Sequence, residues 1–173
     1  MFDPSVLKKG AIIYIKASFE EAWRRNVARY EEKRKFSILA HMVPREQMER
    51  LYGQDDWDLI TKGEENGFIE ISGVKIPFVT MDNEKEAKDP KIMMERYRNA
   101  LDKLISSYLE SRKEKSSNAR SHFHNLFVFG RPAGGKSEFI EFFKTCEPGK
   151  RRAKFKIAPF SIIDDYLSLR EIS

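Results

Sequence analysis

The sequence predicts an α/β fold in which helices flank a mostly parallel sheet. Two continuous apolar runs, at 11–15 and 125–129, have the length and composition of buried parallel strands. A glycine-rich loop and a helical pattern, at 130–137 and 138–144, directly follow the second run. A long amphipathic pattern after Pro90 supplies a helix between the two runs.

The N-terminal elements are a strand, a capped helix and a shorter helix. The segment Ser18-Phe19-Glu20-Glu21 matches a capping box, with Ser18 as N-cap and Glu21 reaching back to it. The helix should continue to about Ser37, and a second one should follow Pro44 and end at Leu51 or Tyr52. The expected buried stripe of the first helix consists of Phe19, Trp23, Val27 and Tyr30.

A hairpin and a long helix come next. Residues 67–76 alternate in polarity and turn at Ser72-Gly73, and 77–81 reads as a further strand with Pro77 near its start. Asp89 and Pro90 form an N-cap and a first-turn proline. The helix that follows should bury Met94, Tyr97, Leu101, Leu104, Ile105 and Tyr108.

Residues 112–121 are polar and low in apolar content, so we interpret them as a linker. The linker separates a segment 1–111 from a segment 122–173, and together they should form one domain. In the second segment, Glu147-Pro148-Gly149 ends the helix after the glycine loop, and 160–163 is expected to be a last strand.

The glycine loop is the most informative motif. Its residues fit the pattern G-x-x-x-x-G-K-[ST] at every fixed position: Gly130, Arg131, Pro132, Ala133, Gly134, Gly135, Lys136 and Ser137. Glycines let consecutive backbone N–H groups turn inward, and the positive end of the next helix adds to this anion site. Lys136 would reach the β- and γ-phosphates of a bound nucleoside triphosphate, and Ser137 would offer its hydroxyl to Mg²⁺.

Composition limits the kinds of partner and the compartment that the protein can have. The net charge of +5 suits a phosphate-rich partner, and the single cysteine, Cys146, excludes an internal disulfide. No apolar stretch is long enough to cross a bilayer, and the N-terminus lacks the form of a signal peptide, so we expect a cytoplasmic protein without a membrane partner. The histidines lack metal-ligand spacing, and Trp57 is expected to be a packing anchor.

The chain resembles a small P-loop kinase of the nucleoside/nucleotide kinase type, with its halves in swapped order. Residues 1–109 are similar to the C-terminal half, through 12–26, 37–44 and 79–84. Residues 123–172 are similar to the N-terminal half, through the glycine loop and Ile162-Ile163-Asp164-Asp165. The resemblance implies a three-layer P-loop NTPase fold. The swapped order would arise in a circular permutant, in a piece of a tandem kinase, or through exchange of elements in a homodimer.

The resemblance also implies roles for residues outside the loop. The helix with Arg24, Arg25 and Arg29 corresponds to a lid whose arginines close over the transferred phosphate, although a solvated charged face is the alternative. Asp82 and Asn83 should lie near the nucleotide base, or merely form a turn.

Two carboxylates end the last expected strand. Asp164 or Asp165 could act as base toward the acceptor or bind Mg²⁺ through water, and either could instead cap a helix.

The expected function is therefore ATP-Mg²⁺-dependent phosphoryl transfer to a small-molecule acceptor. The alternative is a nucleotide-binding or assembly module without catalysis. A nucleic-acid-binding protein, suggested by Lys150-Arg151-Arg152 and by 112–120, ranks last because no aromatic residues are interleaved with these basic ones.

Overall fold

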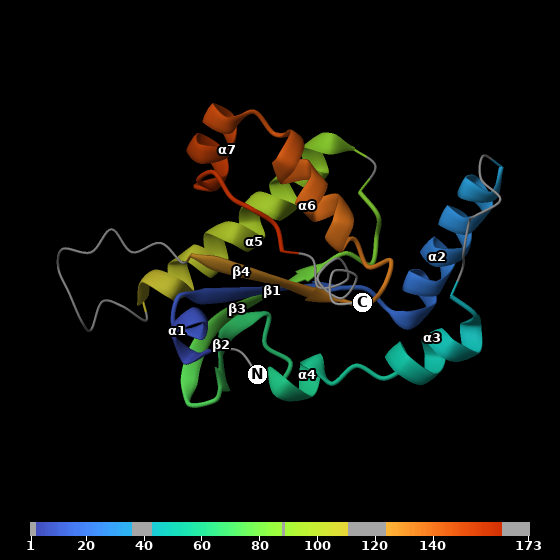
Figure 1. Cartoon of the computed structure of the whole chain (residues 1–173), viewed down its shortest axis with the longest axis horizontal. Helices are drawn as coiled ribbons and strands as arrows, with labels where there is room; N and C mark the ends of the chain where they lie inside the picture. Colours follow the sequence, from blue (N-terminus) through green and yellow to red (C-terminus); the bar gives the residue numbers. More distant parts are fainter. Residues whose placement is uncertain (1–2, 36–42, 88, 111–123, 164–173) are drawn as a thin grey trace, which may run out of the picture.

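The structure is a computed structural model, and it describes residues 3–35, 43–87, 89–110 and 124–163. It is an α/β fold with an open, mostly parallel sheet flanked by helices (Figure 1). In chain order the elements are α1 (Pro4–Leu7), β1 (Gly10–Lys16), α2 (Phe19–Arg34), α3 (Arg45–Tyr52), α4 (Trp57–Ile60), β2 (Asn66–Ile71), β3 (Val74–Asp82), α5 (Pro90–Glu110), β4 (Asn125–Gly130), α6 (Lys136–Thr145) and α7 (Pro148–Phe155).

The four strands of the described sheet lie in the order β2-β3-β1-β4. β1 runs parallel to both β3 and β4, with Ile12 opposite Phe78 on one side and Phe127 on the other. The predicted neighbourhood of the two apolar runs is thus confirmed. Both strands were predicted to be central. Only β1 is, because β4 is the edge of the described sheet.

Side chains of β1 alternate between two cores, because successive residues of a strand point to opposite faces. Ala11, Ile13 and Ile15 pack under α5, α6 and α7. Ile12 and Tyr14 pack on the other face, where α1 and α4 lie (Figure 1). Burial on both faces explains why this strand reads as a continuous apolar run.

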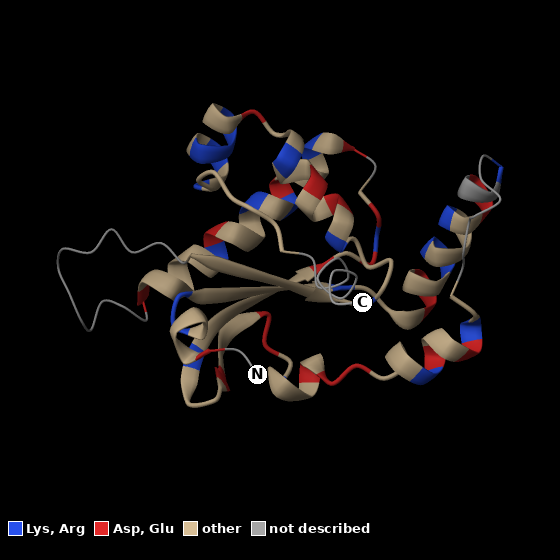
Figure 2. Ribbon diagram, in the orientation of Figure 1, with Lys and Arg blue, Asp and Glu red and all other residues tan. Residues whose placement is uncertain are grey.

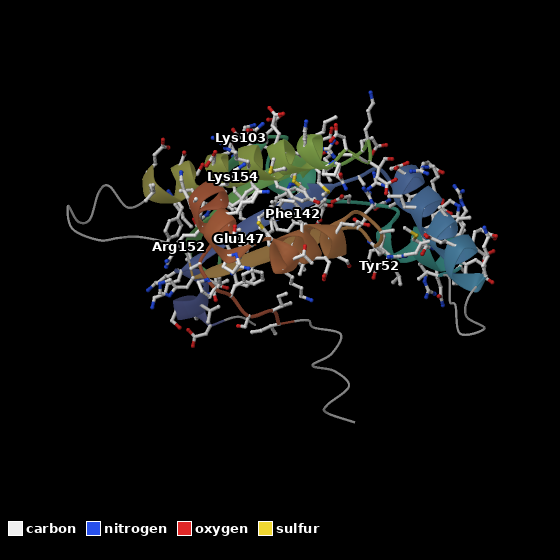
Figure 3. All side chains as sticks on the ribbon, turned by 90° about the horizontal axis from the view of Figure 1, so that it is seen from above. Tyr52, Lys103, Phe142, Glu147, Arg152 and Lys154 are labelled. Atoms are coloured by element: carbon white, nitrogen blue, oxygen red, sulfur yellow. The ribbon has the colours of Figure 1, made fainter. Side chains whose placement is uncertain are left out.

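Aromatic side chains fix α6, the helix after the glycine loop, against its neighbours. Phe143 contacts Phe139, Phe142 and Phe155 edge-on, with ring centroids 4.9–5.1 Å apart. Tyr97 of α5 packs on the same group, and the helices cover the sheet in the view from above (Figure 3). Edge-to-face packing adds to area burial, so α6 has a well-defined position under the loop.

The hairpin turn at Ser72-Gly73 is confirmed, and both residues have positive φ, 52° and 74°. The division at Pro77 was wrong, because β3 runs through it without interruption. Pairing of β3 with β1 begins at Phe78. Pro77 therefore lies just before the residues of β3 that pair with β1. Within that paired stretch, a proline would lack the N–H that the ladder needs.

The C-terminal part differs most from expectation. The first helix after the glycine loop, α6, ends at Thr145 with Cys146 as its C-cap. Glu147 then starts a further helix, because its carboxylate accepts the N–H of Gly149 at 3.1 Å and Pro148 occupies the first turn of α7. The expected strand at 160–163 is wrong, since these residues form no ladder. Ile163 is 89% exposed, while the ring of Phe160 covers Arg151 at 5.0 Å.

The start of α2 confirms half of the capping box. The hydroxyl of Ser18 accepts the N–H of Glu21 at 3.1 Å. The reciprocal bond is made by Glu84, whose carboxylate accepts both the N–H and the hydroxyl of Ser18 at 2.6 Å. Glu21 is held elsewhere by two arginines, so it does not reach back.

The buried stripe of α2 was also predicted wrongly. Its most buried side chains are Ala22, Arg25 and Asn26. The four expected aromatic and aliphatic side chains are half-buried, because α2 lies beyond the strand ends and not over the sheet (Figure 1).

Candidate functional site

The glycine loop lies where the parallel strands end. β4 ends at Gly130, and α6 begins at Lys136, so the predicted strand, loop and helix are all present. The carboxyl ends of β1 and β3 lie beside it, because all three strands run in the same direction. This edge is where open α/β sheets bind their ligands.

The loop has the backbone geometry that a phosphate cradle needs. Ala133 and Gly135 have positive φ values of 58° and 110°, and Gly135 caps α6. The N–H of Gly134 donates to the carbonyl of Arg131 at 3.0 Å, which closes the turn. Left-handed residues alternating with ordinary ones, followed by a helix N-terminus, direct backbone N–H groups to one side.

The side chain of Lys136 folds back over the loop. Its Nζ donates to the carbonyls of Gly130 at 2.6 Å and Arg131 at 2.8 Å. An ammonium is thereby placed over the loop. The hydroxyl of Ser137, in the first turn of α6, is exposed. It is a hard oxygen ligand of the kind that Mg²⁺ accepts.

Arg131 fastens the loop to the rest of the chain. Its guanidinium donates to the carbonyls of Ala17 and Tyr52, both at 2.9 Å, and lies 3.2 Å from Asp55. Within the predicted loop, Arg131 therefore contributes its side chain to structure, and only its main chain borders the cradle. Pro132, the next residue, is half-buried.

Asn83 also touches the loop. Its Nδ2 donates to the carbonyl of Gly134 at 2.8 Å, and its Oδ1 accepts Arg96 at 2.6 Å. Its own carbonyl accepts Arg25 at 2.6 Å. We call this set of contacts the Asn83 clamp, and it joins the end of β3 to the cradle. The resemblance implied a place near the nucleotide base, which stays a prediction, and in the structure the side chain lies on the glycine loop.

Sequence reasoning missed Arg96 as a member of this clamp. It lies on α5, thirteen positions after Asn83, and also donates to the carbonyl of Lys85 at 3.0 Å. Nothing in the local pattern distinguishes Arg96 from the other basic residues of that helix.

The predicted carboxylates are placed only in part. Asp82 ends β3, and its Oδ1 accepts the N–H of Glu84 at 2.9 Å, so it forms the turn that was the alternative interpretation. Asp164 and Asp165 lie outside the described residues, and their roles stay predictions.

Two of the predicted lid arginines, Arg24 and Arg25, differ in environment. Arg25 is 9% exposed and bridges Glu21, at 2.7 Å, to the carbonyl of Asn83. Arg24 is 58% exposed and bonds to Glu21 at 2.6 Å and 2.7 Å. Arg25 thus holds the strand end in place, while Arg24 remains at the surface beyond it.

Glu21 should make the stability of this corner depend on pH. Hydrogen bonds from Arg24, and then Arg25, lower its pKa from the ordinary 4.5 to about 2. A depressed carboxyl pKa stabilises the fold above pH 4.5, and the contribution is lost as pH falls from 4.5 toward 2. Urea unfolding of the wild type and Glu21→Gln should therefore show a stability difference at pH 6 that shrinks at pH 3. A difference independent of pH would contradict the assignment.

The basic run at Lys150-Arg151-Arg152 does not form one surface. Figure 2 shows Lys and Arg along α7, but Arg151 is 9% exposed and donates to the carbonyl of Phe143 at 2.9 Å. Lys150, Arg152 and Lys154 are exposed. Arg151, one of the three consecutive cations, is therefore buried and stabilises the packing of α7 on α6.

The chain matches no protein-family model, no curated protein and no solved structure. Among the described residues, no helix is long and apolar enough to cross a membrane. In the same part of the chain, no group of three His, Cys, Asp or Glu side chains could hold a metal ion.

Proposed function

We propose that this chain is an ATP-dependent phosphotransferase that acts on a small-molecule acceptor. The observation that carries the proposal is the loop at 130–137, with left-handed Ala133 and Gly135 and with Nζ of Lys136 over its carbonyls. Phosphoryl transfer depends on positioning and charge neutralisation, and this loop supplies a main-chain cradle and a cation.

The loop residues have separate roles in this proposal. Main-chain N–H groups of 133 and 135–137 bind the phosphates, while that of Gly134 keeps its bond to Arg131. Lys136 moves from the loop carbonyls to the β- and γ-phosphate oxygens. Ser137 is the protein ligand of Mg²⁺, which neutralises phosphate charge when bound. Asp164 or Asp165 remains the proposed acceptor base, and Arg24 the arginine that reaches the transferred group.

A nucleotide-binding module without catalysis is the second candidate. The observation that favours it is the commitment of Arg25 to Glu21 and to the carbonyl of Asn83, which leaves fewer cations for the transition state. Such a module would use the same loop, so binding alone does not separate the two candidates.

Calorimetry and ADP release together separate them. ATP with Mg²⁺ should bind the full chain, and ADP should accumulate faster when a suitable acceptor is present. If ATP binds but no ADP is released with any of the acceptors tested, the nucleotide-binding module is favoured. Absence of ATP and GTP binding by folded protein rejects both.

The Asn83 clamp should affect nucleotide affinity. Asn83→Ala removes the donor to Gly134 and one acceptor of Arg96, so the cradle loses its fixed position. A hydrogen bond involving a charged group is worth about 1.5–3 kcal/mol, so the Kd for ATP-Mg²⁺ should rise about tenfold. Calorimetric titration measures it.

Asn125→Ala is the matched control for Asn83. Its amide also donates to a main-chain carbonyl, that of Val6 at 3.1 Å, but at the opposite end of the strands. It should cost some stability and leave ATP affinity unchanged. Equal losses of affinity in both variants would show that the clamp acts only through general stability.

A further inference from the structure

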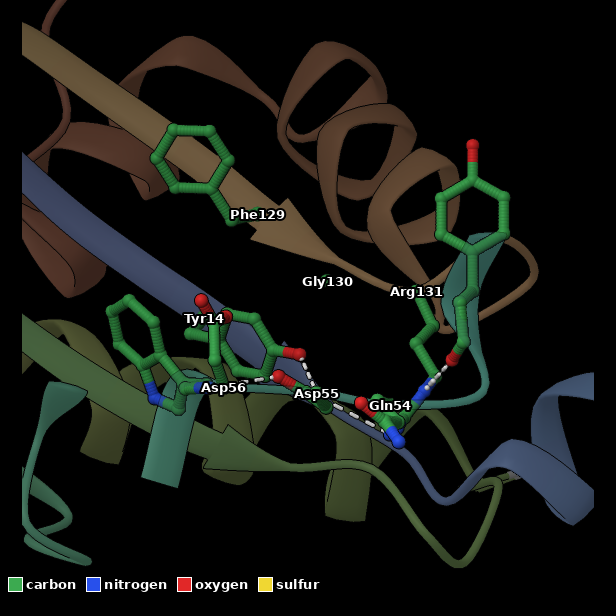
Figure 4. A pocket seen from close by; sticks show the side chains of 9 residues that line it. Tyr14, Gln54, Asp55, Asp56, Phe129, Gly130 and Arg131 are labelled. Atoms are coloured by element: carbon green, nitrogen blue, oxygen red, sulfur yellow. Dashed lines mark hydrogen bonds and ion pairs between the residues drawn. The ribbon is translucent and has the colours of Figure 1, made fainter. Parts of the chain in front are cut away.

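A pocket of about 270 Å³ adjoins the start of the phosphate loop (Figure 4). Gly130 and Arg131 belong both to the loop and to the pocket wall. The rest of the wall comes from β1, β4 and the segment that ends α3 and begins α4. A ligand in this pocket would lie beside the cradle, within the same edge of the sheet.

Four aromatic rings line the pocket, from Tyr14, Tyr52, Trp57 and Phe129. Tyr14 and Trp57 are stacked, with centroids 4.4 Å apart and planes 8° apart, so they form a rigid floor. Phe129 is 44% exposed and Tyr52 40% exposed. Exposed aromatic faces present negative π density, which attracts cations.

The pocket lining has more carboxylates than cations. Arg131 is paired with Asp55, which also accepts the hydroxyl of Tyr14. Burial, and then this bond to Asp55, raise the pKa of Tyr14, so its phenol remains a neutral donor. Asp56 is exposed, and its carboxylate has no partner among the described residues.

Two carboxylates and one guanidinium leave the pocket lining with a formal charge of −1. The cation in the lining is already bonded to Asp55 and to main-chain carbonyls. A phosphate or carboxylate on a ligand would therefore meet the carboxylate of Asp56, and the lining offers it no second cation, only the neutral amide of Gln54. A ligand with an ammonium group would meet a carboxylate and aromatic faces together, which is the chemistry that recognises amines.

We propose that this pocket holds the acceptor, and that the acceptor is a hydroxyl compound carrying an ammonium group. The inference rests on the proposed function and names its substrate class. The ammonium lies at Asp56 against an exposed aromatic face of the lining, and the hydroxyl faces the cradle. Its oxygen bonds to the γ-phosphorus, the bond from that phosphorus to the β,γ-bridging oxygen breaks, ADP leaves, and the hydroxyl proton passes to the acceptor base of the proposed function.

The test uses glucosamine and glucose, which differ by an amine in place of one hydroxyl. Titration into the full chain, with a non-hydrolysable ATP analogue and Mg²⁺ present, should show glucosamine binding at least about tenfold tighter. Asp56→Asn and Phe129→Ala should each remove most of this preference. Asp58→Asn, which changes an exposed carboxylate outside the pocket that is paired with Lys16 at 2.5 Å, should retain it.

The outcomes separate this inference from the proposed function. Glucosamine should bind Lys136→Ala as it binds the wild type, since the pocket does not include Lys136. If the wild-type protein binds glucosamine but does not bind ATP, the phosphotransferase proposal is rejected and the amine site is kept. Equal affinity for glucose, absence of binding by glucosamine, or an Asp56→Asn variant that keeps the preference overturns the amine site. Amine binding that does not speed ADP release overturns the acceptor assignment.

Discussion

Replacing Lys136 by alanine should abolish nearly all phosphoryl transfer and weaken ATP-Mg²⁺ binding about 100-fold. The Nζ atom lies 2.6 Å and 2.8 Å from the carbonyls of Gly130 and Arg131, so the ammonium is already over the cradle. Charge-assisted contacts to phosphate are strong, and loss of one preorganised donor costs about 10²–10³ in rate. ADP release and calorimetric titration measure the two effects.

Lys144→Ala is the control for this substitution. Lys144 lies in the last turn of the same helix, is exposed, and faces Glu141 at 3.6 Å. Its replacement should leave ATP affinity unchanged. If the variant at 136 binds ATP as tightly as the wild type does, the loop is not the nucleotide site.

Gly130→Ala should destabilise the fold by about 3 kcal/mol, through strain and overpacking together. Gly130 has φ of 144°, which side-chain-bearing residues rarely adopt, and a Cβ there would clash with the main-chain carbonyl of Ile15. Neither the strand β1 nor the loop can move aside without breaking the ladder between β1 and β4. Urea unfolding, followed by far-UV circular dichroism, measures the change.

Gly73→Ala separates strain from close approach. Gly73 also has positive φ, 74°, but open space surrounds the position of a Cβ. It should cost only the strain, about 1 kcal/mol. Equal losses at 73 and 130 would contradict the view that β4 needs glycine to approach β1.

Elements with strong local signals were predicted correctly from the sequence. The strand, loop and helix around 125–145 follow from an apolar run, a glycine pattern and helical periodicity, all within one short stretch. The pairing of β1 with β4 was also predicted, because both runs are continuously apolar. Burial on both faces holds for β1, whereas β4, at the edge of the described sheet, is only half-buried.

Other features depend on contacts between distant segments. Glu84 replaces Glu21 as the partner of Ser18 because the end of β3 lies beside the start of α2. The apolar residues at 160–163 form no strand, since propensity alone supplies no ladder partner. The helix after Pro148 did have a local signal, namely an acidic cap before proline, which resembles the correctly predicted start at Asp89-Pro90.

The candidate site divides in the same way. Its loop could be predicted, whereas the Asn83 clamp and the pocket beside Arg131 join residues from several elements. No spacing in the sequence encodes the meeting of Asn83 with Gly134, because the strands β3 and β4 bring them together only through β1.

The pairing of β1 with β4 has a consequence for synthesis of the chain. β1 leaves the ribosome before its partner Asn125–Gly130, which emerges only after α5 has been made. Until then Ala11, Ile13 and Ile15 lack the cover of α6 and α7, so the nascent protein exposes part of this apolar surface. The glycine loop therefore takes its place only when β4 joins the other three strands of the described sheet, a pairing of distant segments that is intrinsically slow.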